Sequence, residues 1–402
     1  MVTLAFGDAP VEGLVYLLPG EDGIGAGYAV DLDEDGIADR EGRLERGIGF
    51  GYRFLAPGVH RLRVTFDLPT GERRVVEPVV VVNDPSRTET LVESMVPPAD
   101  PDWRSFEGIV MDPAGEHLYV AAYSGGSLVQ LDPTDLSVLR RIDTIGYSIE
   151  GLTVAPSGER LFAVYKYHHL ATVAIPEMVL EHRHERISPG AFFIRAVGES
   201  RVLVSGRGPL SLMDPFSGAI LGQATSAGGE LLYSWHFAVS EDRATAVVAG
   251  RSEAGSDRIH VVDLATMTVR REIPLPLLYT ETVALDPHEP RAYVLGNDVD
   301  TGRLLVVDIE TGEVLRDLAL GPSYCGSYCV ANPTAVAAGG RYVAMEWYGG
   351  AYVIDTELDL PVHRLGYYGF SNSGFSVTGS PTEEDVFYFL DSGGGLRKVR
   401  VR

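Results

Sequence analysis

The sequence predicts an all-β protein in which a unit of four short strands is repeated along most of the chain. The unit begins Gly-apolar-x-apolar-Asp/Ala-Pro-x-Gly and later contains apolar-apolar-Asp-x-x-Thr/Ser-Gly, most clearly in the copy from Glu281 to Leu315. The aspartate that ends the third strand returns after 39 to 49 residues. That spacing is typical of a four-stranded antiparallel sheet with alternating apolar residues. The positions in this register are Asp132, Ile175, Asp214, Asp263, Asp308 and Asp355.

The number of copies predicts a seven-bladed β-propeller, in which the sheets stand as blades around a central channel. The last copy, 374–402, has room for only three strands. Because an open sheet edge invites aggregation, we expect the segment 88–96 to supply the missing strand. The propeller is therefore expected to span residues 86–402. First strands are expected to begin near Gly108, Gly151, Phe192, His236, Thr282, Pro333 and Gly374.

The second strands of several copies share a Tyr-Val pair. It occurs in Leu118-Tyr-Val, Ala292-Tyr-Val and Arg341-Tyr-Val. Together with the Asp-x-x-Thr-Gly turns, these strands resemble the YVTN family of β-propellers. The resemblance implies the fold and leaves the activity open, because this fold serves adhesins, surface-layer proteins, lyases, lactonases and redox enzymes.

Residues 1–85 lack the repeat and contain short apolar segments separated by proline and glycine. This pattern predicts a small immunoglobulin-like β-sandwich. The run Tyr52-x-Phe54-x-x-Pro57-Gly58-x-His60 resembles the second half of a PKD domain. The Trp-Asp-Phe-Gly-Asp-Gly signature of that family is absent, so the prediction is a PKD-like sandwich. Such modules imply a spacer or an adhesive unit.

The same region holds the motif with the clearest chemistry, Asp-x-Asp-x-Asp-Gly-x-x-Asp. Carboxylates at alternate positions converge when the chain turns tightly at Gly36, and such oxygen ligands suit Ca²⁺. The spacing is similar to the calcium loops of integrin-type repeats, and it lacks the glutamate that an EF-hand requires. The alternative is a solvated acidic turn. The expected calcium ligands are Asp31, Asp33, Asp35, Asp39 and the carbonyl of Ile37.

Composition limits the function classes. The formal net charge of −23 argues against a nucleic-acid partner and against anionic membrane surfaces. No apolar run reaches the length of about 20 residues that a membrane span needs. No signal peptide is visible at the start of the sequence, and we nevertheless expect an extracellular or cell-surface location, with the periplasm as the alternative.

The two cysteines lie close together in the loop between the fifth and sixth copies. Cys325 and Cys329 have the spacing of a small disulfide that staples a loop in an oxidising compartment. A metal site built from two thiolates is the alternative. No Cys-x-x-Cys-His follows, so covalent haem is not indicated.

Residues at the mouth of the channel form the candidate site, because polar and aromatic groups converge there from several copies. Aligning the copies places Glu107, Glu150, Ala191, Trp235, Glu281, Asn332 and Ser373 in one ring. The candidate ligand-binding residues are Glu107, Glu150, Glu281, Tyr167, Trp235, Trp347 and Tyr348. The candidate catalytic residues are His168, His169, His236, Glu150 and Glu281. The alternatives are glutamates that bind water or neighbouring backbone amides, and histidines that are ordinary surface residues.

Three functions remain open from the sequence. The first is a secreted or cell-surface binding or structural protein with a structural Ca²⁺, whose partner is a protein, a glycan or another copy of itself. The second is a propeller enzyme, namely a lyase, a lactone hydrolase or a metal- or quinone-dependent oxidoreductase, in which a histidine or glutamate acts as acid, base or ligand. The third is a subunit of a larger extracellular assembly.

Overall fold

The computed structural model describes most of the chain, and each structural statement below concerns that part. It comprises residues 2–3, 11–17, 25–32, 35–44, 48–54, 58–76, 79–82, 88–95, 106–122, 126–143, 149–165, 169–185, 187, 191–206, 208–226, 228–234, 236–251, 257–297, 301–322, 335–336, 340–346, 350–366, 376–390 and 395–402. Every regular element in these ranges is a β-strand, which confirms the predicted all-β class. Within the same ranges no helix is long and apolar enough to cross a membrane.

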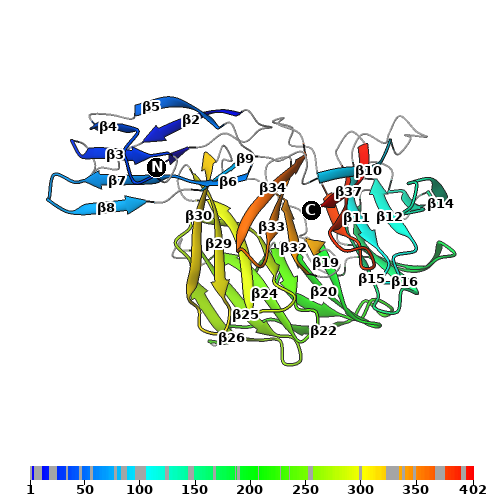
Figure 1. Cartoon of the computed structure of the whole chain (residues 1–402). Helices are drawn as coiled ribbons and strands as arrows, with labels where there is room; N and C mark the ends of the chain where they lie inside the picture. The colour runs from blue at the N-terminus through cyan, green and yellow to red at the C-terminus, as the bar shows by residue number, and fades with distance from the viewer. Residues whose placement is uncertain are drawn as a thin grey trace.

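Seven four-stranded antiparallel sheets follow one another from residue 88 to the C-terminus (Figure 1). The first contains β11 (Phe106–Met111), β12 (Leu118–Ala122), β13 (Leu128–Leu131) and β14 (Val138–Ile142). The second contains β15 (Ile149–Val154), β16 (Arg160–Tyr165), β17 (His169–Ala174) and β18 (Val179–His184). The third contains β19 (Ala191–Gly198), β20 (Arg201–Gly206), β21 (Ser211–Met213) and β22 (Ile220–Gln223). The fourth contains β23 (His236–Val239), β24 (Thr245–Arg251), β25 (Asp257–Asp263) and β26 (Thr268–Pro274).

The remaining three sheets continue the same order. The fifth contains β27 (Tyr279–Leu285), β28 (Arg291–Asn297), β29 (Thr301–Asp308) and β30 (Val314–Pro322). The sixth contains β31 (Ala335–Val336), β32 (Tyr342–Glu346), β33 (Gly350–Asp355) and β34 (Leu360–Gly366). The seventh contains β35 (Ser376–Gly379), β36 (Val386–Leu390), β37 (Gly395–Val401) and, paired with β37, β10 (Thr88–Met95) from the start of the region.

The central positions of the second strands are apolar because both faces of these strands are buried. In β12, Leu118 and Val120 pack in a cluster with Val386 of the seventh sheet. The alternate residues Tyr119 and Ala121 pack in a second cluster with the second sheet. Seven such clusters lie between successive sheets, and together they close a ring. The Tyr-Val pattern therefore reflects a strand with a neighbouring sheet on each side.

The recurring Asp-x-x-Thr-Gly segment is a turn that caps its own backbone. In the fifth sheet, Asp308 Oδ1 accepts hydrogen bonds from the N–H groups of Glu310 (2.8 Å) and Thr311 (2.7 Å). Gly312 follows with a φ of 83°, a conformation that favours glycine. Asp263 caps its turn in the same way. Because these turns carry their own stabilising contacts, they fix where the third strand ends.

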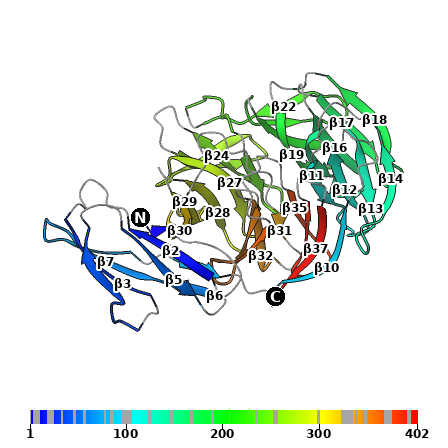
Figure 2. The same ribbon diagram turned by 90° about the horizontal axis from the view of Figure 1, so that it is seen from above.

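The N-terminal region forms three further sheets beside the ring (Figures 1 and 2). One contains β1 (Val2–Thr3), β2 (Val11–Leu17) and β5 (Ile48–Phe54), and one contains β4 (Arg40–Arg43), β3 (Gly27–Asp31), β7 (Arg63–Asp67) and β8 (Arg73–Val76). A third pairs β6 (Gly58–Arg61) with β9 (Val79–Val82). Strands β1 and β9 contact β30, and β9 also contacts β34. The PKD-like sandwich and the boundary at residue 85 stay predictions.

The pairing register corrects part of the alignment of the copies. Gly108 pairs with Ala121, and the equivalent residue in the third sheet is Phe193, which pairs with Ser205. The sequence alignment used Phe192 instead. It was displaced by one residue because the connection from β19 to β20 is one residue shorter than its counterpart in the second sheet: Ala196 pairs with Val202, whereas Val154 pairs with Leu161. In the sixth and seventh sheets the equivalent residues are Ala335 and Ser376. Pro333 and Gly374, the residues the alignment used there, lie outside the described ranges.

Candidate functional site in the central channel

The first strand of each sheet contributes one residue to a common level of the channel, which we call the ring position. It is the residue that pairs with the equivalent of Ala121 in the second strand. Five of its seven residues are small, and two are large. The members are Gly108, Gly151, Phe193, His236, Thr282, Ala335 and Ser376. The two large residues lie on neighbouring sheets, and their rings are 4.5 Å apart at an angle of 52°.

The small residues permit close approach of neighbouring strands. A Cβ atom on Gly151 would lie 2.7 Å from the carbonyl oxygen of Phe192 in β19. Such a distance requires the backbone to move, so glycine is required for this packing. The channel therefore has one side of small residues and one side filled by Phe193 and His236.

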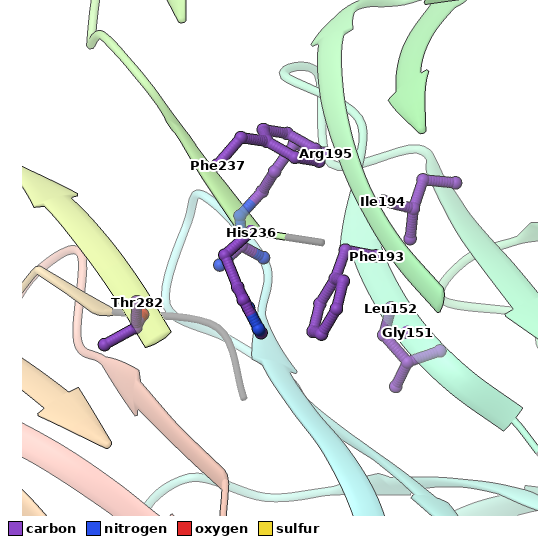
Figure 3. A pocket seen from close by; sticks show the side chains of 8 residues that line it. All are labelled: Gly151, Leu152, Phe193, Ile194, Arg195, His236, Phe237 and Thr282. Carbon is purple, nitrogen blue, oxygen red and sulfur yellow. The ribbon is translucent and has the colours of Figure 1, made fainter. Parts of the chain in front are cut away.

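A small cavity lies where these two sides meet. Its volume is about 20 Å³, which is enough for one water molecule or a group of similar size. Figure 3 shows side chains from β15, β19, β23 and β27 around it. Most of the lining is apolar, and the polar side chains come from three strands. The lining residues are Gly151, Leu152, Phe193, Ile194, Arg195, His236, Phe237 and Thr282.

Arg195 is the charged residue of this lining, and the other described sheets have no charge at its position. It pairs with Leu203 of β20. The equivalent residues of the first, second, fourth, fifth and seventh sheets are Val110, Thr153, Ala238, Ala284 and Thr378. Burial lowers the pKa of Arg195 to about 10 because the surrounding protein desolvates the guanidinium. A group with that pKa remains protonated at neutral pH.

His236 contributes a neutral imidazole. Its side chain is 8% exposed, and desolvation lowers its pKa to about 3. The hydroxyl of Ser234 lies within hydrogen-bond distance of two backbone oxygens, those of His236 (2.9 Å) and Ala249 (2.5 Å). Its single proton can be donated to either of them. This contact ties the start of β23 to β24. The imidazole can thus donate or accept a hydrogen bond without carrying a charge.

The predicted channel residues are only partly described. Glu150 is half-buried on β15, one residue before the ring position. Glu107 and Glu281 lie at the same level of β11 and β27, and their side chains are outside the described part. His169, on the second sheet, stacks on Tyr165 with ring centroids 5.0 Å apart, whereas His236 is on the fourth sheet. Outside the described ranges are Tyr167, His168, Trp235, Cys325, Cys329, Trp347 and Tyr348.

No three histidine, cysteine, aspartate or glutamate side chains among the described residues gather in a way that could hold a metal ion. The channel thus combines an arginine, a neutral histidine and a threonine. The sequence analysis named His236 as a candidate site residue. It did not predict that Arg195, Phe193 and Thr282 line the same cavity as His236. The signal that could have found Arg195 is a charge in a first strand where the other copies carry valine, threonine or alanine.

The predicted calcium loop is described at four of its five positions, and Asp33 lies outside the described ranges. Asp31 Oδ2 accepts the N–H of Gly36 (2.9 Å), and Asp39 Oδ2 accepts the N–H of Leu32 (2.8 Å). Asp31 is buried, and within the described residues its Oδ1 atom has no hydrogen-bond partner. Buried oxygens normally have partners. The described carboxylates Asp31, Asp35 and Asp39 do not by themselves gather into a metal site, so calcium binding by this loop stays a prediction.

We predict that His236 makes the stability of the protein depend on pH. The histidine takes up a proton near pH 6.5 when unfolded and only near pH 3 when folded, so the unfolded state binds more protons between these values. Stability should therefore fall as the pH falls from 6.5 towards 3, by roughly 2 kcal/mol at about pH 5. Urea unfolding at several pH values measures this effect. The free energy of unfolding should depend less steeply on pH in His236→Gln than in the wild type. The exposed His288→Gln is the control, and an equal slope in all three proteins would contradict the prediction.

Comparisons with known proteins identify the fold. No protein-family model matches the sequence, and no curated protein matches it either. Among solved structures, a chain of hydrazine synthase from Kuenenia stuttgartiensis is 14% identical, with a TM-score of 0.62, over 76% of this chain and 98% of that one. The β-propeller domain of Cps50 (Swd1) from Myceliophteria thermophila is 12% identical, with a TM-score of 0.57, over 77% of this chain and 100% of that one. At this identity the likeness shows the fold alone, and the chain contains a β-propeller.

Proposed function

We propose that this protein is a secreted or cell-surface binding or structural protein whose propeller associates through its outer edges. The observation that carries the proposal is a row of exposed aliphatic residues on three successive sheets. Strands β14, β18 and β22 each begin with an exposed aliphatic pair. The pairs are Val138 and Leu139, Val179 and Leu180, and Ile220 and Leu221.

This row is interrupted at the fourth sheet. In the fourth sheet the outer strand β26 begins with exposed Thr268 and buried Val269 instead. The three sheets of the row are neighbours, since clusters of buried residues join the first to the second and the second to the third. Each outer strand is also an edge whose outward backbone groups have no partner strand in its sheet. Exposed apolar residues along sheet edges favour association with another protein surface.

A second copy of the chain is the partner that the proposal names. The net charge of −23 opposes contact between copies at low ionic strength. Salt screens this repulsion and strengthens apolar contact. Association through the aliphatic row should therefore increase with salt, unlike association through ion pairs.

Replacing Leu139, Leu180 and Leu221 together with serine should weaken self-association. Removing three half-exposed leucines from an interface should cost roughly 2 kcal/mol, which raises Kd by about 30-fold. Sedimentation velocity over a range of protein and NaCl concentrations measures this. Leu278→Ser, at a leucine of similar exposure on another part of the surface, is the matched control. A wild-type protein that stays monomeric under all conditions would contradict the proposal.

The proposed location rests on the N-terminal region and on composition. Acidic charge, two closely spaced cysteines and an N-terminal β region beside the propeller are typical of exported modular proteins. We propose that the loop around Asp31 and Asp35 binds a structural Ca²⁺, supported by the unsatisfied buried oxygen of Asp31. The ion would stabilise the loop that connects β3 and β4.

Calcium should stabilise the protein relative to its chelated form. A ligand that binds only the folded state raises Tm, here by about 2–4 °C at saturation. Asp31→Asn and Asp35→Asn should abolish the effect. Asp67→Asn is the control, because Asp67 is an exposed carboxylate of the same sheet that pairs with Arg73. Equal melting curves in Ca²⁺ and in EGTA would refute the calcium site.

The alternative function is a propeller enzyme with its site in the channel. The observation that favours it is the group formed by Arg195, His236 and Thr282 around one cavity. We place it second because the space among these described residues, about 20 Å³, is enough for one small group.

A further inference from the structure

We propose that strand β18 binds a divalent transition-metal ion through His182 and His184. This strand is the outer strand of the second sheet and lies at the rim of the ring (Figure 2). The site is separate from the channel and from the predicted calcium loop, and it does not depend on the proposed function. The ion is of the class of Cu²⁺, Ni²⁺ and Zn²⁺, because imidazole nitrogen suits these metals, whereas Ca²⁺ and Mg²⁺ prefer oxygen ligands.

The two histidines replace residues of other kinds at equivalent positions of the repeat. His182 pairs with Thr172 of β17, and His184 pairs with Leu170. The equivalent pairs of the first, fourth and fifth sheets each consist of an arginine and, two residues later, an aliphatic residue. They are Arg140 and Ile142, Arg271 and Ile273, and Arg316 and Leu318. The fold therefore does not require imidazoles at these positions, and the change to His-x-His in the second sheet needs another reason.

The strand places both imidazoles on one face. Alternate residues of a strand point to the same side of the sheet, and the rings of His182 and His184 lie nearly parallel, at 9°, with their centroids 6.3 Å apart. A metal ion with bonds of about 2 Å to two imidazole nitrogens holds the two ring centroids about 5 to 6.5 Å apart. The observed separation lies within this range, so one ion can bridge the two rings after a rotation of their side chains.

One ring nitrogen of His184 lacks a partner. Its Nε2 atom is buried and, within the described residues, has no hydrogen-bond partner, although buried polar atoms normally have one. The Nδ1 side of the ring packs on the turn between β21 and β22, where a Cβ atom added to Gly218 would lie 3.1 Å from Nδ1. A metal ion bound to Nε2 would supply the missing partner.

The surroundings of the pair tolerate a cation. Arg160, whose guanidinium lies over the ring of Phe216 next to the pair, is itself paired with Glu181 at 2.9 Å. Arg183 stands between the two histidines in the sequence and therefore points to the opposite face of the strand. No third histidine, cysteine, aspartate or glutamate of the described part joins the pair. The protein thus supplies two ligands, and water completes the coordination of the ion.

Isothermal titration calorimetry of the full chain with CuCl₂, NiCl₂ and ZnCl₂ tests the site, in a buffer containing CaCl₂ so that oxygen-rich sites are occupied. The wild type should bind these ions, and Cu²⁺ should bind most tightly. His182→Arg and His184→Ile restore the residues of the other sheets and should therefore fold. Each should weaken Cu²⁺ binding by about 10-fold or more, because even the outer contacts of a metal ligand contribute that much. His288→Gln, at an exposed histidine of the fifth sheet, is the matched control and should bind like the wild type.

Electron paramagnetic resonance of the Cu²⁺ complex identifies the ligands directly. The wild-type spectrum should show splitting from two imidazole nitrogens, and a folded single variant should lose one of them. A wild-type spectrum without two nitrogen ligands would overturn the proposal, even if the variants fail to fold. The proposal is also overturned if the wild type binds none of the three metals, or if all of its binding survives in folded His182→Arg and His184→Ile.

Discussion

The pairing of β10 with β37 is the constraint on which the rest of the structure depends. It joins residues 88–95 to the last strand of the chain, and through it the seventh sheet becomes four-stranded. Leu91 and Val92 pack against the cluster between the seventh and first sheets. The ion pairs Glu93–Arg397 and Glu89–Arg402 lie on the exposed surface, where such pairs contribute little. Backbone hydrogen bonds and apolar packing therefore hold the ring closed.

Closure of the ring of sheets determines which side chains line the channel. Because every sheet is packed between two others, the central positions of its second strand are apolar and closely packed. The first strands border the channel, and their residues differ from one copy of the repeat to the next. Gly151 allows two strands to approach closely, whereas Phe193, Arg195 and His236 fill the opposite side. A symmetric scaffold thus carries an asymmetric lining, as expected when function is added to a fold that serves many functions.

The sequence was informative where physical causes are local. Turns such as Asp308-x-x-Thr-Gly contain their own caps, so their spacing predicted repeated four-stranded sheets and the all-β class. The register of the third sheet was missed because the connection from β19 to β20 is one residue shorter than in the second sheet, and only the strand pairing reveals this. Arg195 was missed for a related reason: its neighbours in the cavity come from strands distant in sequence, and only the closed ring brings it near His236 and Thr282. The remaining predictions at the mouth of the channel, including Trp347 and Tyr348, lie outside the described residues.

Hydrogen exchange of the backbone amides is the measurement that tests ring closure most directly. If β10 is a full member of the seventh sheet, its amides should exchange as slowly as those of β36 and β37, and they should become exposed together with them in denaturant. Rapid exchange throughout residues 88–95, with β36 and β37 still protected, would show that the ring is not closed by this strand and would contradict the account.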